Sequence, residues 1–356
     1  MSWGFDGRLI FEFPIEVGGG NQMKIIVTGG AGFVGTHLVS ALLNQGHNVE
    51  SIDNLSTGSY ENAALHLNNP GYFFHRASLE TLPELEAMVE SSDVVFHLAA
   101  SVGVKNIVEN PIHCIENNVF CTSQLLKWAH EYKKRIITFS TSEVYGKSQK
   151  FPFSEEDDVV LGPSNKLRWA YAASKLLDDY LAQAYAQHKG MAVTIVRLFN
   201  TIGQRQVGHY GMVVPRFFEA ALSGGPITIY GTGQQTRCFT DVRDVVNCLL
   251  LLIDCKESLG ELINIGTPQE VSMTSLAKRI CEISNSSSEL KYISYEEAYG
   301  KGFEDMERRV PNNEKLKRLT GYTFKHDLNS TLEWIHEEFK NKNQVVVPRK
   351  SFENIL

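Results

Sequence analysis

The sequence predicts an α/β fold, in which a doubly wound parallel sheet is followed by a smaller C-terminal lobe. Two observations support this prediction. Short apolar runs alternate with helical patterns up to about residue 200, and such alternation is typical of a parallel sheet with helices on both faces. After that point the chain becomes rich in glycine and proline, which indicates a lobe built largely from loops. A chain of 356 residues is long enough for both parts.

The expected elements follow from the apolar patterns in chain order. Short and largely apolar runs predict strands at 24–28, 48–53, 72–77, 93–99, 135–140 and 192–199. Apolar residues at helical spacing predict helices at 36–44, 114–132 and 169–188. We expect a helical run over 241–254 and a strand-like run over 262–265 to return to the sheet.

These elements divide the chain into a sheet domain and a lobe. The sheet domain should span 23–200 and regain 238–265, whereas the lobe should take 201–237 and 266–345. Residues 1–22 form an N-terminal extension that lacks the basic start and apolar core of a secretory signal. Residues 346–356 form a tail.

The composition excludes several classes of function. The net charge is −7 and no run of lysine and arginine stands out, so nucleic acid is not an expected partner. The most apolar run, Val245 to Ile253, is far shorter than the roughly 20 residues of a membrane-spanning helix. Six cysteines are scattered without a CxxC pair, and no histidines have metal-ligand spacing. The scattered cysteines predict reduced thiols in a cytoplasmic protein, and the lack of metal-ligand spacing predicts no metal site.

A glycine-rich turn follows the first expected strand. Its glycines Gly29, Gly32 and Gly35 fit the spacing GxxGxxG and open the first helix. This context lets backbone N–H groups approach a pyrophosphate at the helix N-terminus, as in a Rossmann-type sheet. Asp53 ends the second strand, 18 residues after Gly35, where a carboxylate accepts hydrogen bonds from ribose hydroxyls and repels a 2′-phosphate. The sequence therefore predicts NAD rather than NADP.

Tyr171 and Lys175 stand four residues apart in a predicted helix and thus share one face. A tyrosine ordinarily loses its proton near pH 10. We expect the lysine ammonium and the positive nicotinamide ring to favour the tyrosinate, which would make Tyr171 a usable base.

Polar side chains also gather where the strand before this helix ends. Ser140, Thr141, Ser142 and Glu143 follow an otherwise apolar run. Ligands of open α/β sheets bind at the carboxyl ends of the strands, so these residues are expected to lie in the same site as Tyr171.

The motifs TGGAGFVG, STSEVYG, YAASK and RLFN together resemble the extended short-chain dehydrogenase/reductase family that modifies nucleotide sugars. The resemblance covers about 23–338. It implies that the sheet domain binds NAD and the lobe binds a nucleoside diphosphate sugar, here a UDP-linked one. It also implies hydride removal from sugar C4, with Tyr171 as base, Lys175 lowering its pKa, and Thr141 hydrogen-bonding O4. The helices at 114–132 and 169–188 would pair with their copies in a homodimer.

The same resemblance implies two sets of binding residues. The cofactor contacts are Gly29, Gly32, Phe33, Val34, Gly35, Asp53, Asn54, Ser78, Leu79, Leu98, Ala99, Ala100, Asn118, Ser140, Tyr171 and Lys175. The substrate contacts are Asn200, Val213, Val214, Tyr230, Arg237 and Arg309. One departure from the family lies at Ser78, where an aspartate usually stands beside the adenine, and it weakens that contact.

Three reactions share the C4 oxidation, namely decarboxylation of UDP-glucuronate, 4-epimerisation of a UDP-hexose or UDP-uronate, and 4,6-dehydration. Glu143 argues against a minimal epimerase, and Ser142 against a thymidine-type dehydratase, although guanosine-type dehydratases stay possible. The segments 162–171 and 302–311 resemble bacterial UDP-glucuronate decarboxylases, in which Ser142, Glu143 and Arg309 match residues around the substrate carboxylate. We therefore favour a decarboxylase. Outside the enzymes, a non-catalytic NAD-binding regulator is the alternative, although Tyr171 and Lys175 are both present.

Overall fold

The computed structural model describes residues 22–102, 110–208, 211–299 and 304–344. The tail at 346–356 and the N-terminal extension, apart from residue 22, lie outside this range. Along the described chain, no helix is both long and apolar enough to cross a membrane.

The centre of the molecule is a seven-stranded sheet in the order β11-β6-β5-β4-β1-β2-β3, and every pair in it is parallel. Its strands are β1 (Lys24–Thr28), β2 (Asn48–Ile52), β3 (Tyr72–His75), β4 (Val94–His97), β5 (Arg135–Thr141), β6 (Val193–Leu198) and β11 (Leu262–Ile265). All six strands expected in the first 200 residues are present, and β11 returns to the sheet as predicted. The strand order reverses between β1 and β4, the point at which doubly wound sheets bind their ligands.

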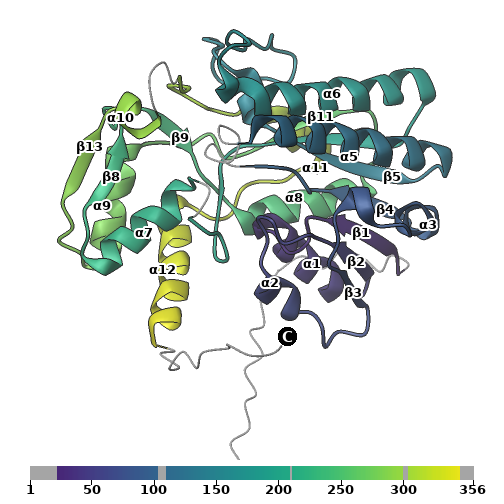
Figure 1. Ribbon diagram of the computed structural model, residues 1–356, viewed down its shortest axis with the longest axis horizontal. Helices are drawn as coiled ribbons and strands as arrows, with labels where there is room; N and C mark the ends of the chain where they lie inside the picture. Colours follow the sequence, from purple (N-terminus) through teal and green to yellow (C-terminus); the bar gives the residue numbers. More distant parts are fainter. Residues whose placement is uncertain (1–21, 103–109, 209–210, 300–303, 345–356) are drawn as a thin grey trace, which may run out of the picture.

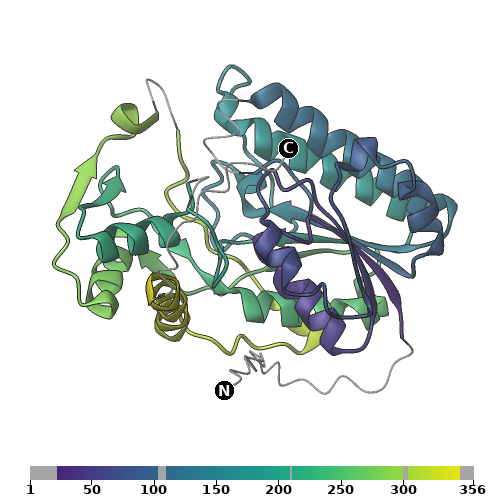
Figure 2. The ribbon, with the colours of Figure 1, turned by 60° about the horizontal axis from the view of Figure 1, so that its bottom comes forward.

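Helices cover both faces of the sheet, as Figure 2 shows. One layer contains α1 (Phe33–Asn44) and α8 (Val242–Asp254), and the other contains α3 (Leu85–Ser91), α5 (Pro111–Glu131) and α6 (Ala170–Lys189). On the first face, Leu38 and Leu249 are fully buried in one cluster. On the second face, Leu126 and Ile136 are fully buried in another. The predicted α/β fold with a doubly wound sheet is thus confirmed.

The lobe stands beside the carboxyl edge of the sheet (Figure 1). Its main elements are α7 (Val213–Ser223), β8 (Ile227–Tyr230), β9 (Thr236–Cys238), β12 (Glu270–Ser272), α9 (Met273–Ser284), β13 (Leu290–Ile293), α10 (Tyr295–Tyr299) and α12 (Leu328–Gln344). Strands β8 and β13 pair in parallel, and β9 and β12 pair antiparallel. Phe218, Leu276 and Leu332 form part of its own apolar core.

The connections between the two parts are short. Strand β7 (Thr201–Ile202) pairs with β10 (Thr240–Asp241) directly before α8. Helix α2 (Tyr60–Ala64) and the short turns η1 (Leu79–Thr81) and η4 (Lys256–Ser258) also belong to the sheet domain.

One segment that we expected in the lobe packs on the sheet domain instead. Helix α11 (Glu314–Thr320) contacts α8 and β11, and its Leu316 is 1% exposed in the core of that domain. The following turn is fixed by Tyr322, whose hydroxyl donates to the buried Asp244 carboxylate at 2.6 Å. Helix α11 therefore packs on the sheet domain because the residue that follows it, Tyr322, hydrogen-bonds a buried carboxylate of α8. The local sequence pattern does not reveal this long-range contact.

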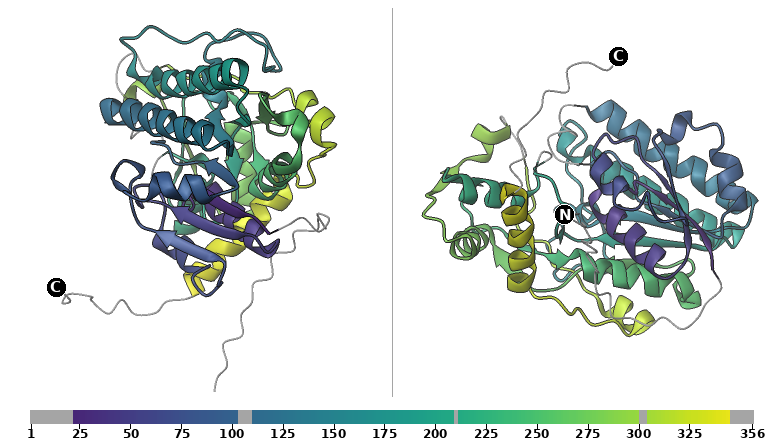
Figure 3. Two further views of the ribbon diagram at one scale, coloured as in Figure 1. Left: turned by 90° about the vertical axis from the view of Figure 1, so that its right-hand side faces the viewer. Right: turned by 90° about the horizontal axis from the view of Figure 1, so that it is seen from below.

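Helix α12 then returns to the lobe and stands between the two parts (Figure 3). It packs on α9, while its Trp334 ring lies 4.1 Å from the Arg243 guanidinium of α8. Gln204 donates to the Trp334 carbonyl at 2.7 Å. These contacts fix the lobe against the sheet edge and hence fix the walls of the site between them.

Candidate active site

A cavity of about 510 Å³ opens between the carboxyl ends of the central strands and the lobe. Its walls come from the glycine turn, the ends of β2, β4, β5 and β6, the start of α6, and α7 and β8 of the lobe. All the predicted site residues line this cavity except Asn118. The structure thus brings the predicted cofactor, catalytic and substrate residues together in one place.

The glycine turn forms a cradle that side chains would fill. Gly29 has a φ of +72°, and a Cβ there would lie 2.8 Å from the backbone nitrogen of Ala99. A Cβ on Gly35 would lie 2.1 Å from the Gly29 carbonyl oxygen. Helix α1 begins after Gly32 with no side-chain cap, so its first N–H groups are available to a phosphate. The residues present therefore fit the pyrophosphate of a dinucleotide.

The residues predicted to contact the ribose and adenine follow β2 and β3. The Asp53 carboxylate accepts N–H groups from Ala31 at 3.0 Å and Leu55 at 2.8 Å. Burial raises the pKa of Asp53, and these backbone donors act in the opposite direction. Asn54 donates from its side-chain amide to the Ser78 hydroxyl at 3.0 Å. Ser78, the position that departs from the family, is thus held by Asn54 at the cavity wall.

Asn118 lies behind the wall rather than in it. Its side chain is 1% exposed, accepts the Ser101 N–H at 2.8 Å, and donates to the Ser174 hydroxyl at 3.2 Å. Asn118 therefore ties the segment after β4 to α6, and its predicted direct contact with the cofactor stays a prediction. The sequence matched the motif but could not show which way the side chain faces.

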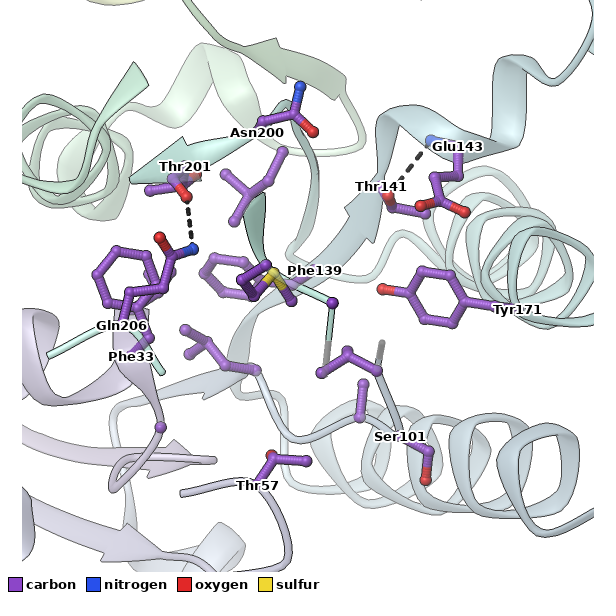
Figure 4. Close-up of a pocket in the computed structure, with 18 of the residues that line it drawn as sticks. Phe33, Thr57, Ser101, Phe139, Thr141, Glu143, Tyr171, Asn200, Thr201 and Gln206 are labelled. Atoms are coloured by element: carbon purple, nitrogen blue, oxygen red, sulfur yellow. Dashed lines mark hydrogen bonds between the residues drawn. The ribbon is translucent and has the colours of Figure 1, made fainter. Parts of the chain in front are cut away.

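Tyr171 projects from α6 with its hydroxyl toward the middle of the cavity, next to Thr141 and Glu143 (Figure 4). Burial raises the pKa of Tyr171, the negative charge of Glu143 adds to this, and the nearby Thr141 hydroxyl acts in the opposite direction. The Lys175 ammonium is buried and pairs with Asp178 at 3.0 Å. Because that pairing offsets its charge, the lowering of the Tyr171 pKa by Lys175 stays a prediction.

Glu143 is the centre of a buried group of charges. It stands in the short turn η2 (Ser142–Tyr145), where its N–H donates to the Thr141 hydroxyl at 3.2 Å. Its carboxylate oxygens lie 2.6 Å from Arg168 Nη1 and 3.5 Å from Arg309 Nη1. Burial alone would raise the pKa of Glu143, but the two guanidinium groups outweigh it and the pKa is lowered. Glu143 is thus held ionised.

Asp305 extends this charged group into the lobe. Its carboxylate lies 2.9 Å from Arg237 Nη2 and 3.5 Å from Arg168 Nη2. Together with Arg309 and Glu143, the group has three guanidinium and two carboxylate groups, hence one net positive charge. Burial lowers the pKa of Arg309 to about 10, and repulsion by Arg237 adds to this. The Nε atom of Arg309 is buried and has no hydrogen-bond partner among the described residues. Such a group suits an anionic ligand.

The remaining substrate residues line the lobe side. Val213 and Val214 begin α7, and Asn200 donates to the Cys238 carbonyl at 3.2 Å. The Tyr230 hydroxyl accepts a hydrogen bond from Arg216 Nη2 at 2.6 Å. These contacts place the predicted residues at the cavity wall, while their roles toward a ligand stay predictions.

Comparison with known proteins places this site in a family. The sequence matches the NAD dependent epimerase/dehydratase family over residues 25–266, which is more than half of the chain. The chain belongs to this family. It is therefore an NAD-dependent enzyme, in agreement with the predicted family and with the cradle described above. The cofactor is NAD.

Relatives of the family share most of the chain. A UDP-N-acetyl-alpha-D-glucosaminuronate decarboxylase from Bacillus cytotoxicus is 41% identical over 89% of this chain and 98% of that protein. UDP-glucuronic acid decarboxylase 1 from Xenopus tropicalis is 32% identical over 92% of this chain and 76% of that protein. Among solved structures, the UDP-glucuronic acid 4-epimerase from Bacillus cereus, in complex with UDP-glucuronic acid and NAD, has a TM-score of 0.81. It is 28% identical, over 90% of this chain and 100% of that one.

Two charged residues of the site were missed by the sequence analysis. Arg168 and Asp305 both line the cavity, and both stand in the segments 162–171 and 302–311 that resemble decarboxylases. The resemblance of these two segments to decarboxylases could therefore have pointed to both residues, but it did not show that their side chains lie close together. Residues 302 and 303 of the second segment lie outside the described residues.

Within the described ranges, no group of His, Cys, Asp and Glu side chains is arranged to hold a metal ion.

Proposed function

We propose that this enzyme decarboxylates a UDP-linked hexuronic acid after oxidising its C4. The observation that carries the proposal is the buried pairing of Glu143 with Arg168 and Arg309 beside Tyr171. The Nε of Arg309 is buried and has no hydrogen-bond partner among the described residues, so it is available to a substrate carboxylate. Relatives over nearly the whole chain are decarboxylases of UDP-uronic acids.

The first half of the reaction needs a base at the sugar O4 and an acceptor for the C4 hydride. Bound NAD supplies the hydride acceptor, and its positive ring favours the tyrosinate. The Thr141 hydroxyl faces the same part of the cavity as Tyr171 (Figure 4) and is assigned to orient O4, while Tyr171 takes the O4 proton. Because burial and Glu143 raise the pKa of Tyr171, the base forms only when a positive charge is near it.

The second half uses the β-keto acid that C4 oxidation creates. The bond between C5 and C6 breaks, its electron pair delocalises toward the C4 oxygen, and C6 leaves as neutral CO₂. We assign Arg309 to orient the carboxylate before it leaves. Glu143 stays ionised beside it, so departure of the substrate charge as a neutral molecule is favoured by repulsion. A proton is then returned to C5. Return of the hydride from the reduced cofactor to C4, with the proton on Tyr171 returned to O4, would then give a UDP-linked pentose with no net redox change.

A 4-epimerase is the second candidate, because it needs the same first half. The solved epimerase of Bacillus cereus has the same overall fold. The Glu143–Arg168–Arg309 group argues against an epimerase of an uncharged UDP-hexose, which has no carboxylate to bind. For a UDP-uronate, the ionised Glu143 beside the substrate carboxylate favours loss of CO₂ over epimerisation. Dehydration is a further alternative that the family name includes.

The test is product analysis with a panel of nucleotide sugars. The purified protein is incubated with NAD and UDP-glucuronate, UDP-N-acetylglucosaminuronate, UDP-glucose, GDP-mannose or dTDP-glucose, and products are read by mass and NMR. We expect loss of CO₂ from a UDP-uronate. Unchanged mass with inverted C4 would instead establish an epimerase, and loss of water a dehydratase.

We further propose a homodimer formed through α5 and α6. Large apolar side chains on these helices are exposed, with Ile112 at 72%, Phe120 at 63% and Leu177 at 51%. Such surfaces are typical of association sites. Sedimentation of the unmutated protein and of Phe120→Glu tests this, and we expect a dimer for the former and weaker association for the latter. A monomer at micromolar concentration would contradict it.

The cytoplasmic location is also proposed, since all six cysteines are free.

A further inference from the structure

Arg168 joins two carboxylates that come from different parts of the molecule. It lies in the short turn η3 (Leu167–Trp169) directly before α6, and its side chain is only 4% exposed. Its Nη1 lies 2.6 Å from Glu143, at the end of β5, and its Nη2 lies 3.5 Å from Asp305, in the lobe. Arg168 therefore stands between two negative charges that would otherwise face each other in a buried site.

The position of Arg168 is itself fixed by packing. Its guanidinium lies 5.3 Å from the centre of the neighbouring Trp169 ring. Trp169 is 3% exposed, packs with Val144 and Met306, and donates from Nε1 to Glu304 at 3.2 Å. The same apolar cluster thus holds both the turn before α6 and the lobe segment that contains Asp305.

We propose that Arg168 is a positioning residue, which holds the Glu143 carboxylate in one orientation beside Tyr171 and Arg309 and connects it through Asp305 to Arg237. The inference rests on the proposed function in that it gives Glu143 a part in decarboxylation. It adds that Arg168 acts through Glu143 rather than on the substrate.

The distribution of hydrogen-bond donors separates the two arginines on Glu143. Arg168 directs Nη1 to Glu143 at 2.6 Å, a short charge-assisted contact. Arg309 lies farther from the same carboxylate, at 3.5 Å, and so is less committed to it. Arg309 is therefore the better receptor for a substrate carboxylate, and Arg168 the better support for Glu143.

The ionisation of Glu143 depends on all the groups that face it. These are Arg168 and Tyr171 from the α6 side, and Arg309 and Asp305 from the lobe side. Burial acts to raise the pKa of Glu143, and Arg168 is the strongest charge that opposes it. Removal of the Arg168 charge should therefore raise the pKa of Glu143, because Arg309 lies farther from its carboxylate and the negative charge of Asp305 is then no longer offset by an arginine that contacts both carboxylates.

The first test is a direct titration of Glu143, which needs no substrate. The full chain with NAD is labelled with [δ-¹³C]glutamate, and the Glu143 signal is assigned by its loss in Glu143→Gln. We expect Arg168→Gln to raise the apparent pKa of Glu143 by about one unit or more, the usual effect of removing a close opposite charge. Arg168→Lys keeps a charge on a single donor group and should lie between. The matched control is Arg308→Gln, whose guanidinium pairs with Glu270 at the surface and should change nothing. An unchanged titration in Arg168→Gln, or in Arg168→Lys if only that variant folds, would overturn the proposal.

The second test is the pH profile of CO₂ release from UDP-glucuronate and UDP-N-acetylglucosaminuronate. Arg168→Gln should lower kcat roughly 10- to 100-fold, a part of the usual effect of a positioned proton-transfer or charged group. KM should stay nearly constant, and the acid limb should move to higher pH. A raised Glu143 pKa with normal kcat would overturn the positioning role. If the unmutated protein releases no CO₂, the proposed function fails, and the titration alone still decides how Arg168 acts on Glu143.

Discussion

Replacement of Arg309 by glutamine should remove decarboxylation while leaving the fold nearly intact. At 3.5 Å and an effective dielectric constant of about 20, the attraction between Arg309 and Glu143 is roughly 5 kcal/mol before desolvation. Burial of Arg309 and repulsion by Arg237 oppose it, which is why the pKa of Arg309 falls to about 10. Glu143 also keeps Arg168 at 2.6 Å in the variant. Loss of one partner of a buried ion pair usually costs about 3–5 kcal/mol, because it leaves the other charge unpaired. Glu143 is not left unpaired here, so we expect the free energy of unfolding to change by less than about 2 kcal/mol.

The effect on turnover should be much larger. If Arg309 orients the substrate carboxylate, its loss removes one pre-organised donor, worth about 2.7–4 kcal/mol or roughly 10²–10³-fold in rate. The assay is CO₂ release from a UDP-uronate, with NAD binding and urea unfolding measured on the same preparation. Arg308→Gln is the matched control, because its side chain is 47% exposed and pairs only with Glu270 among the ion pairs of the described residues. Near-normal CO₂ release by Arg309→Gln would refute the reasoning.

Three further predictions concern the base, the cofactor and pH. Tyr171→Phe should lower turnover by roughly 10²–10⁴-fold with NAD binding intact, and Lys175→Met should do at least as much damage; near-normal turnover of Tyr171→Phe in a steady-state assay would show that another group is the base. Asp53→Ala should weaken NAD binding and relax discrimination against NADP, as calorimetric titration can show, whereas equal affinity of the unmutated protein for both cofactors would contradict this account. The folded-state pKa values of Glu143 and Asp305 are lowered, so both contribute stability at neutral pH that is lost as pH falls below their ordinary values near 4. Unfolding of Asp305→Asn should accordingly depend less steeply on acid than that of the unmutated protein, and parallel curves would count against the linkage.

The sequence predicted the sheet and the position of the site because both depend on local signals. Apolar runs such as 24–28 and 262–265 match β1 and β11 residue for residue. The glycine turn, Glu143 and Tyr171 were each recognisable in the sequence, and they converge because the carboxyl ends of parallel strands share one edge.

What the sequence did not predict depends on distant parts of the chain. Arg168 and Asp305 are 137 residues apart, so their contact requires the lobe to be folded against the sheet. Asn118 matched a motif, but its burial behind the wall follows from its bonds to Ser101 and Ser174. The return of α11 to the sheet depends on Tyr322 reaching a buried carboxylate of α8. None of these pairings leaves a periodic signal in the local sequence.

The central claim is that C4 oxidation in this site leads to loss of C6 as CO₂. The most direct measurement uses UDP-glucuronate and UDP-N-acetylglucosaminuronate labelled with ¹³C at C6, incubated with the unmutated enzyme and NAD and followed by NMR. We predict that at least one of them gives labelled CO₂ in equal amount to a UDP-linked pentose without the label. Retention of the label in a sugar of inverted C4 configuration would contradict the account and establish epimerisation instead.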